Sequence, residues 1–177
     1  MTLDDYRKEF EQSSNRSVSM PIAGTIVWAA MAVIALFIEQ KVSVYILLFA
    51  TGAIFPLALL IAKVRNENLV SSKNPLAKLM GLCVLMVNLL WAVHIPLLLN
   101  APEFVPMTLG IGLGLHWIVY SWIVNHPVGI FHAISRTLLV VAAWYLFPNN
   151  SLFSISCVIV LVYFISIYQM LTRQVAN

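Results

Sequence analysis

Charged residues are scarce in this sequence. Lysine, arginine, aspartate and glutamate together make up 10% of its 177 residues, whereas about a quarter of the residues in a soluble domain are charged. Hydrophobic residues make up 61%, and the mean hydropathy is +0.91. This composition excludes an ordinary soluble domain. The formal net charge of +3 is also too small to indicate a nucleic-acid partner, so we expect none.

Cysteine is nearly absent, and the common catalytic motifs are missing. Cys83 and Cys157 each lie in an apolar run without CxxC or Cys/His spacing, so we interpret both as small packing residues. There is no CxxCH motif for attached haem, no HExxH motif for zinc hydrolysis, and no GxSxG around Ser121 or Ser135. We therefore expect no cofactor, and an enzyme is the function class that the sequence supports least.

Strict alternation of polar and apolar residues, which a transmembrane β-strand would need, is also missing. The sequence instead has apolar runs of about twenty residues, the length of helix that crosses ~30 Å of hydrocarbon. This pattern predicts an all-α integral membrane protein whose residues 20–172 form a compact bundle of six transmembrane helices. The expected spans are 21–38, 42–62, 76–99, 103–124, 128–147 and 151–171.

Two prolines lie inside expected spans. Pro56 follows Gly52 in the second span, and Pro96 lies in the third. Because proline removes a backbone hydrogen bond inside a helix, we expect each of these helices to be kinked or broken near its proline.

The first 19 residues form a polar segment, and residues 173–177 are expected to form a short tail. The polar segment does not resemble a cleavable signal peptide, because it does not begin with basic residues followed by a short apolar run. Leu3, Tyr6 and Phe10 fall on one helical face. One interpretation is therefore a short amphipathic helix at the membrane interface, and the other is a solvated tail.

The basic residues predict the orientation of the chain. With an even number of spans, both termini and the loop between spans two and three lie on one side, and the other side carries only Lys41. The positive-inside rule places both termini in the cytoplasm. The short connections are in the style of a bacterial inner-membrane protein. The eight basic residues on the predicted cytoplasmic side are Arg7, Lys8, Arg16, Lys63, Arg65, Lys73, Lys78 and Arg173.

Several strongly polar residues interrupt the apolar spans, most visibly in NHPVGIFHAISRTLLV (125–140). A rise of 1.5 Å per residue places Arg136, His116 and Asn88 near the midplane of spans five, four and three. His132 lies one turn before Arg136 on the same helical face. That face otherwise carries small residues suited to close helix packing, namely Gly129, Ala133, Val140 and Ala143.

Arg136 has no acidic partner at its depth, because none of the seven carboxylates of the chain lies in mid-membrane. Its guanidinium stays charged and therefore needs backbone carbonyls, a water-filled cavity or an anion from outside. One interpretation is a site for a carboxylate or phosphate. The other is structural, with Arg136 bonded to carbonyls or to neighbouring polar side chains. The residues expected to form the binding site are Arg136, His132, His116, Asn88 and Tyr120.

Two further patterns concern metals and subunits. His116, His126 and His132 are weak metal-ligand candidates: zinc accepts three histidines, but His126 and His132 are six residues apart and point in different directions on a continuous helix. Gly110 and Gly114 form a GxxxG motif, which favours close packing within one bundle or between subunits. On this basis we also expect a homo-oligomer.

Three functions are compatible with these features. The first is a small transporter or channel for an anionic or protonatable solute, with histidine titration coupling protons. The second is a scaffold in which a lipid, a quinone or a partner helix occupies a polar groove without being transported. The third, which has the least support, is a metal-dependent membrane enzyme.

Overall fold

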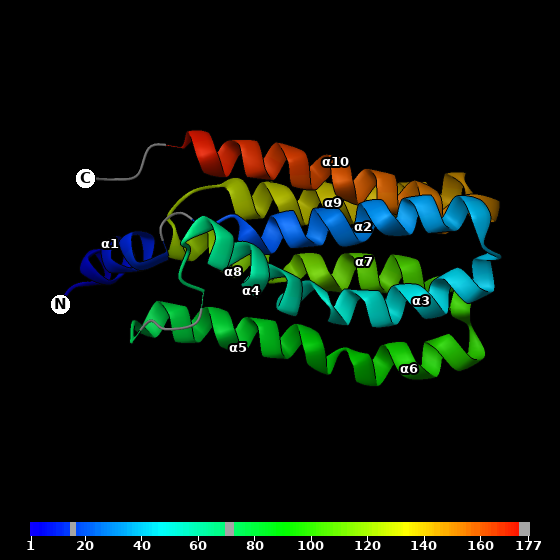
Figure 1. The fold of residues 1–177 in the computed structure, drawn as a ribbon, viewed down its shortest axis with the longest axis horizontal. Helices are drawn as coiled ribbons and strands as arrows, with labels where there is room; N and C mark the ends of the chain where they lie inside the picture. Colours follow the sequence, from blue (N-terminus) through cyan, green and yellow to red (C-terminus); the bar gives the residue numbers. More distant parts are fainter. Residues whose placement is uncertain (15–16, 70–72, 174–177) are drawn as a thin grey trace.

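The computed structural model describes residues 1–14, 17–69 and 73–173, and across these residues it contains helices and no strand. Figure 1 shows long helices that run side by side, with α1 at one end of the bundle. The helices are α1 (Leu3–Ser14), α2 (Ser19–Phe37), α3 (Gln40–Gly52), α4 (Ile54–Arg65), α5 (Pro75–Leu89), α6 (Trp91–Asn100), η1 (Pro102–Phe104), α7 (Val105–Leu115), α8 (Trp117–Ile123), α9 (Val128–Leu146), η2 (Pro148–Asn150) and α10 (Ser151–Thr172).

The long helices have the length and composition of membrane spans. Helices α3 and α4 meet this criterion only as a pair, and the pair is bent by 46°. The described chain is therefore all-helical, with five or six segments that are long and apolar enough to span a membrane. The other segments that meet the criterion are Ser19–Phe37, Pro75–Asn100, Pro102–Ile123, Val128–Leu146 and Pro148–Thr172.

Three of these segments are interrupted. The break between α3 and α4 falls at Ala53, where the ring of Pro56 displaces the carbonyl of residue 52, four positions earlier. In the segment Pro75–Asn100 the break falls at Leu90, between α5 and α6. Pro96 lies six residues later, inside α6. The third break, between α7 and α8, falls at His116.

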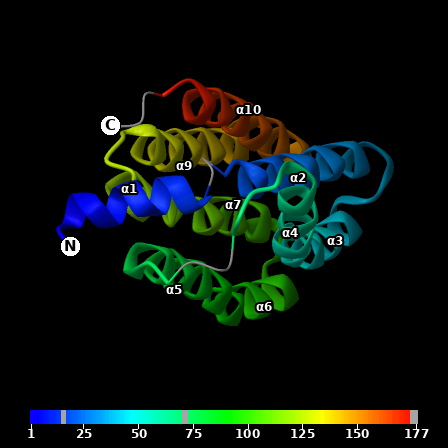
Figure 2. The same cartoon turned by 60° about the vertical axis from the view of Figure 1, so that its left-hand side comes forward.

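The core lies where α2, α9 and α10 pack together (Figures 1 and 2). Trp28 of α2 and Ile159 of α10 are fully buried there. Gly24 allows α2 to approach α10 closely, since a Cβ at this position would lie 2.6 Å from the hydroxyl oxygen of Tyr163. The pair α5–α6 is the least buried of the long segments.

Helix α1 packs against one end of the bundle. Tyr6 and Phe10 contact the hydrophobic core, and the carboxylate of Glu11 lies 2.6 Å from Nη2 of Arg173 at the end of α10. Asn74, which caps α5 by accepting a hydrogen bond from the backbone N–H of Leu76, donates to the carbonyl of Tyr6. Residues 3–14 are therefore helical and docked, which excludes the solvated-tail interpretation for them. Residues 15–16 of the polar segment and residues 174–177 of the expected tail lie outside the described residues.

Candidate functional site

Arg136 is fully buried in the middle of α9. Its Nε–H donates to the carbonyl oxygen of Gly110, at 2.6 Å. The guanidinium carbon lies 5.6 Å from the centre of the Trp28 ring and 5.3 Å from that of Tyr163, so two aromatic faces stabilise its positive charge. The charge is thus accommodated by a carbonyl and by π systems.

The outer half of the same guanidinium is unsatisfied. Neither Nη1 nor Nη2 has a hydrogen-bond partner among the described residues, although both are buried. No ion pair to Arg136 occurs in the described part of the chain. Buried polar atoms are almost always hydrogen-bonded. Two buried N–H-bearing nitrogens are thus left unpaired, in the geometry that binds a carboxylate or phosphate.

The sequence of α9 explains why Arg136 points inward. Residues spaced three or four positions apart lie on one face of a helix. The face that carries Arg136 consists mostly of residues with small side chains. All six residues predicted to share this face are buried, which confirms that prediction. They are Gly129, His132, Ala133, Arg136, Val140 and Ala143.

Glycines of α7 provide the room for Arg136. A Cβ at Gly114 would lie 2.9 Å from Cδ of Arg136, and a Cβ at Gly110 would lie 3.2 Å from Ile159 of α10. The GxxxG motif therefore packs within the chain. Because that face of α7 is already covered by α9 and α10, the motif gives no support to the expected homo-oligomer, which stays a prediction.

His132 lies one turn before Arg136 and stacks on Trp117, with ring centres 3.9 Å apart and an interplanar angle of 12°. The Ser166 hydroxyl donates to the carbonyl of Val162. Its oxygen therefore accepts from Nδ1–H of His132, at 2.9 Å. This bond makes Nε2 of neutral His132 an acceptor, and Nε2 is buried with no partner in the described residues.

His116 lies at the break between α7 and α8 and is half-buried. Its Nδ1 is also without a hydrogen-bond partner among the residues described. Arg136 and His132 lie one turn apart on α9. His116 follows Gly114 of α7, which packs against the Arg136 side chain. We refer to Arg136, His132 and His116 as the Arg–His cluster.

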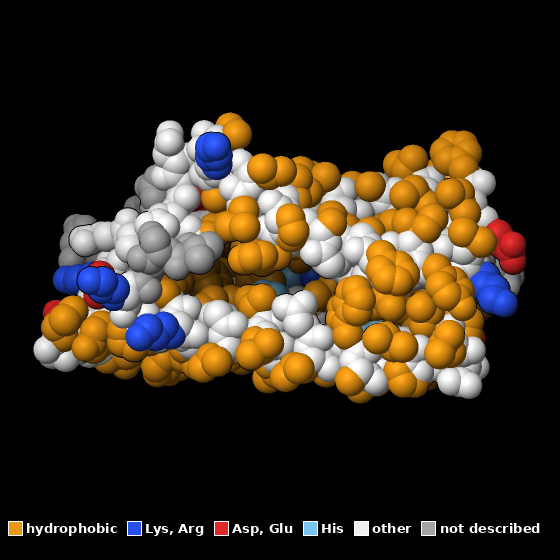
Figure 3. Space-filling view, turned by 60° about the horizontal axis from the view of Figure 1, so that its bottom comes forward, with side chains coloured by type: hydrophobic (Ala, Val, Ile, Leu, Met, Phe, Trp, Pro, Cys, Tyr) orange, Lys and Arg blue, Asp and Glu red, His pale blue; other side chains and the backbone are white. Residues whose placement is uncertain are grey.

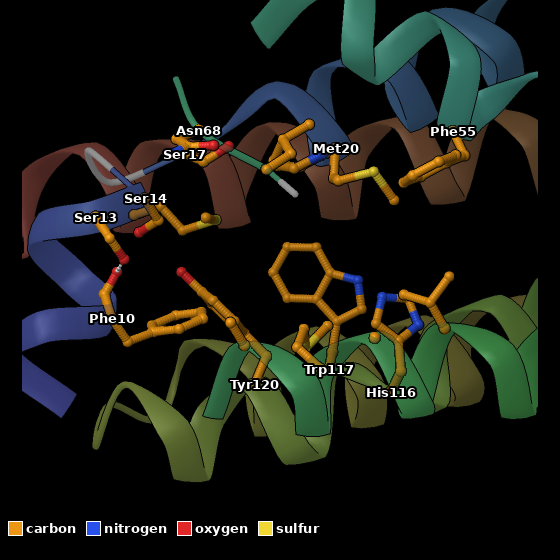
Figure 4. Close-up of a pocket in the computed structure, with 17 residues that line it drawn as sticks. Phe10, Ser13, Ser14, Ser17, Met20, Phe55, Asn68, His116, Trp117 and Tyr120 are labelled. Carbon is orange, nitrogen blue, oxygen red and sulfur yellow. Dashed lines mark hydrogen bonds between the residues drawn. The ribbon is translucent and has the colours of Figure 1, made fainter. Parts of the chain in front are cut away.

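A cavity of about 360 Å³ reaches this cluster at His116. Figure 4 shows Trp117, Tyr120 and His116 along one wall, and Met20 and Phe55 along the wall opposite. In Figure 3 the molecule is hollowed on the flank between α4 and α5, and a histidine surface is visible at the floor of the hollow. The serines of α1 and the α1–α2 connection lie at the end of the cavity farther from His116 (Figure 4).

The structure does not bring all predicted site residues together. Asn88 is exposed, and its amide donates to the carbonyl of Val84 in its own helix. Tyr120 lines the cavity, but toward its α1 end. His94 is buried against Thr108, with Nδ1 3.4 Å from the hydroxyl oxygen. Of the five predicted residues, Arg136, His132 and His116 thus form the cluster, and Tyr120 lines the path to it.

The third metal-ligand candidate, His126, lies in the connection between α8 and α9. Its Nδ1 accepts a hydrogen bond from the backbone N–H of Val128 at the start of α9. Burial lowers the pKa of His126, and the charge of Arg173 lowers it further. Across the described residues, no group of three or more His, Cys, Asp or Glu is placed to hold a metal ion.

Sequence reasoning missed the aromatic partners of the site. Trp28, Trp117 and Tyr163 surround the guanidinium and the His132 ring. The signal available was the depth of Trp28 and Trp117 inside their spans, away from the interfaces where tryptophan usually anchors a helix. The Glu11–Arg173 ion pair had no sequence signal, because its residues are 162 positions apart.

Residues 3–173 match the model of a family described as "Family of unknown function (DUF7010)", and because the match spans nearly the whole chain, the chain belongs to this family. No curated protein and no solved structure matches the chain.

Proposed function

Because this family membership assigns no activity, we propose from the site geometry that the protein is a small transporter for an anionic or protonatable solute. The observation that carries this proposal is the buried Arg136 guanidinium, whose two Nη atoms have no partner among the described residues. An anion is the ligand that such a group binds most strongly in a surrounding of low dielectric constant.

The cluster offers both hydrogen-bond donors and an acceptor. Arg136 presents Nη–H donors, and neutral His132 presents Nε2 as an acceptor. A ligand with an anionic oxygen and an acidic hydroxyl, such as a monoprotonated phosphate, complements both. If His132 takes up a proton, the cluster gains a second positive charge, which would couple anion binding to protons.

The cavity extends from the α1 end to His116, and we propose it as the route to the cluster. We propose that α3 and α4 form one broken span, which gives six spans with both termini in the cytoplasm of a bacterial inner membrane. In this arrangement the cavity opens toward the cytoplasmic half and reaches His116, whereas Arg136 and His132 are fully buried and do not line it. Broken helices near the midplane are a recurrent feature of transporter binding sites.

A second candidate function is binding without transport. The specific observation in its favour is that the cavity opens sideways between α4 and α5. An opening on the flank of a membrane protein gives access to lipid, so a lipid-like or quinone-like molecule could occupy the cavity without crossing the membrane.

Flux into proteoliposomes tests the proposal. Wild-type protein, Arg136→Gln and the matched control Lys41→Gln, which removes a positive charge at an exposed site, are reconstituted and offered labelled phosphate, acetate and decanoate with and without a pH gradient. We expect saturable uptake by the wild type and by Lys41→Gln, and a loss of at least tenfold in Arg136→Gln. Saturable binding that depends on Arg136 without any uptake would instead establish the second function.

A further inference from the structure

The walls of the cavity are mostly apolar, although His116 of the Arg–His cluster lines its deep end. Methionines and aromatic residues are prominent among the lining residues, and flexible methionines adapt to apolar ligands of varied shape. An inorganic ion in this cavity would leave the apolar surface in contact with water, which is unfavourable. The apolar lining residues on which this rests are Phe10, Met20, Phe55, Met80, Trp117 and Met170.

The size of the cavity also exceeds the need of a small anion. Its volume of about 360 Å³ lies within the range of pockets that bury drug-sized molecules, roughly 300–1,000 Å³. A water molecule occupies about 30 Å³ of the liquid. The space beyond the headgroup is therefore large enough for an apolar body.

The opening between α4 and α5 leads to a lipid-facing flank. Phe55 of α4 is 45% exposed and lines the cavity. Leu59 on α4 and Leu85 on α5 are exposed to the outside. Figure 3 shows hydrophobic side chains on both sides of the hollow. A molecule that partitions into the bilayer can therefore reach the cavity without passing through water.

We propose that the ligand is an amphiphilic carboxylate, an anionic headgroup on an apolar body, which enters from the bilayer between α4 and α5. This inference rests on the proposed function, because the headgroup is taken by the Arg–His cluster. The apolar body lies along Trp117 and Phe55 and extends toward the opening. The methionines accommodate its shape.

Gly81 provides a way to fill the cavity without disturbing the fold. It lines the cavity, and a Cβ at this position would meet no atom within 4 Å. Leucine is also a better helix former than glycine. Gly81→Leu should therefore place a side chain in the cavity while α5 stays intact. Ala92→Leu is the matched control, because Ala92 is exposed on α6 and does not line the cavity.

The experiment is equilibrium binding of radiolabelled decanoate to the protein in lipid nanodiscs, with binding to empty nanodiscs subtracted. We expect saturable binding to the wild type and to Ala92→Leu, and affinity at least tenfold weaker in Gly81→Leu and in Arg136→Gln. Acetate and phosphate should compete at least tenfold less well than decanoate. Thermal unfolding of Gly81→Leu within a few degrees of wild type confirms that the variant is folded.

Two outcomes would overturn the inference in distinguishable ways. If acetate or phosphate competes as well as decanoate and Gly81→Leu binds normally, the ligand is a small anion, and the proposed function stands without its apolar body. If uncharged decanol competes as well as decanoate and Arg136→Gln binds both normally, the cavity binds apolar molecules. This result would contradict both the inference and the proposed role of Arg136 in binding an anion.

Discussion

At the scale of single residues, the energetics of Arg136 explain how a charge is tolerated in the core. An arginine at the centre of a membrane helix costs at least about 2.5–3.5 kcal/mol. A hydrogen bond from a charged donor returns about 1.5–3 kcal/mol, and each cation–π contact returns about 0.5–2 kcal/mol. The Gly110 carbonyl and the two rings therefore offset this cost without a ligand, and the Nη atoms remain free to bind one.

Gly129 and Gly81 make a matched pair for testing how closely α9 packs on α8. A Cβ at Gly129 would lie 1.9 Å from the carbonyl oxygen of Trp117, whereas one at Gly81 would meet nothing within 4 Å. Because backbone cannot move aside easily, we expect Gly129→Ala to cost about 3 kcal/mol or more. Gly81→Ala should gain about 0.5–1 kcal/mol. Thermal or denaturant unfolding of both variants measures the difference, and equal stabilities would contradict the packing of α8 on α9.

The hydrogen-bonded carboxyl of Glu67 should make the stability of the fold depend on pH. Burial raises the pKa of this carboxyl, but hydrogen bonds from Ser17, Ser19 and Arg65 outweigh burial and hold the pKa below its ordinary value of 4.5. A lowered pKa stabilises the fold fully above the ordinary value, and this stabilisation is lost as the pH falls through the lowered pKa.

We therefore expect the melting temperature of the wild type to fall more steeply than that of Glu67→Gln below about pH 4.5. Ser17→Ala combined with Ser19→Ala should also reduce the slope, because two of the hydrogen bonds are removed. Melting curves from neutral to acidic pH provide the measurement. Identical slopes in all three proteins would show that the Glu67 bonds do not stabilise the fold.

The sequence predicted which residues of α9 are buried better than it did for α5. In α9, the small and polar residues repeat on one face, and that face is buried. In the third span, apolar residues occur all around the helix, so no pattern fixed the direction of Asn88, which is exposed. The aromatic partners of Arg136 come from α2 and α10, and their proximity depends on tertiary packing that one sequence does not reveal.

At the scale of helices, the interruptions create the site. The break at His116 ends α7 and starts α8, and it turns His116 toward the cavity. The sequence predicted an interruption near Pro56 because the chemistry of proline is local. It did not predict the break at His116, where no proline or glycine occupies the break itself.

Helix α1 should depend on the buried Glu11–Arg173 pair, whose side chains are 7% and 4% exposed. Removing one partner of a buried pair typically costs about 3–5 kcal/mol. In Glu11→Gln we therefore expect amide hydrogen exchange in residues 3–14 to rise on the order of a hundredfold. Asp4→Asn is the control, because the Asp4 side chain is 80% exposed and surface pairs contribute about 0–1 kcal/mol. Unchanged exchange in Glu11→Gln would show that other contacts hold α1.

At the scale of the whole molecule, α1, the end of α10 and the α4–α5 connection lie at one end of the bundle, as Figure 1 shows. The positive-inside rule assigns this end to the cytoplasm. The assignment stays a prediction, and the distribution of lysine and arginine is its basis.

Cysteine labelling in intact cells tests this assignment. In a Cys83→Ser, Cys157→Ser background, a membrane-impermeant maleimide is added to cells that carry Lys73→Cys or Asn149→Cys, two exposed positions at opposite ends. We expect Asn149→Cys to react and Lys73→Cys to react only after the membrane is opened. The reverse pattern would place both termini outside.

The most direct test of an anion site at Arg136 is the ligand-dependent melting temperature of the purified protein. Wild type, Arg136→Gln and Lys41→Gln are melted with a panel of small and amphiphilic anions. A ligand at a hundred times its Kd adds about 2.7 kcal/mol, which corresponds to a rise of roughly 5–10 °C for a chain of this size. We expect at least one anion to raise the melting temperature of wild type and Lys41→Gln by this amount and to leave Arg136→Gln unchanged. A panel that shifts none of the proteins, or shifts Arg136→Gln as much as wild type, would show that Arg136 only holds the bundle together.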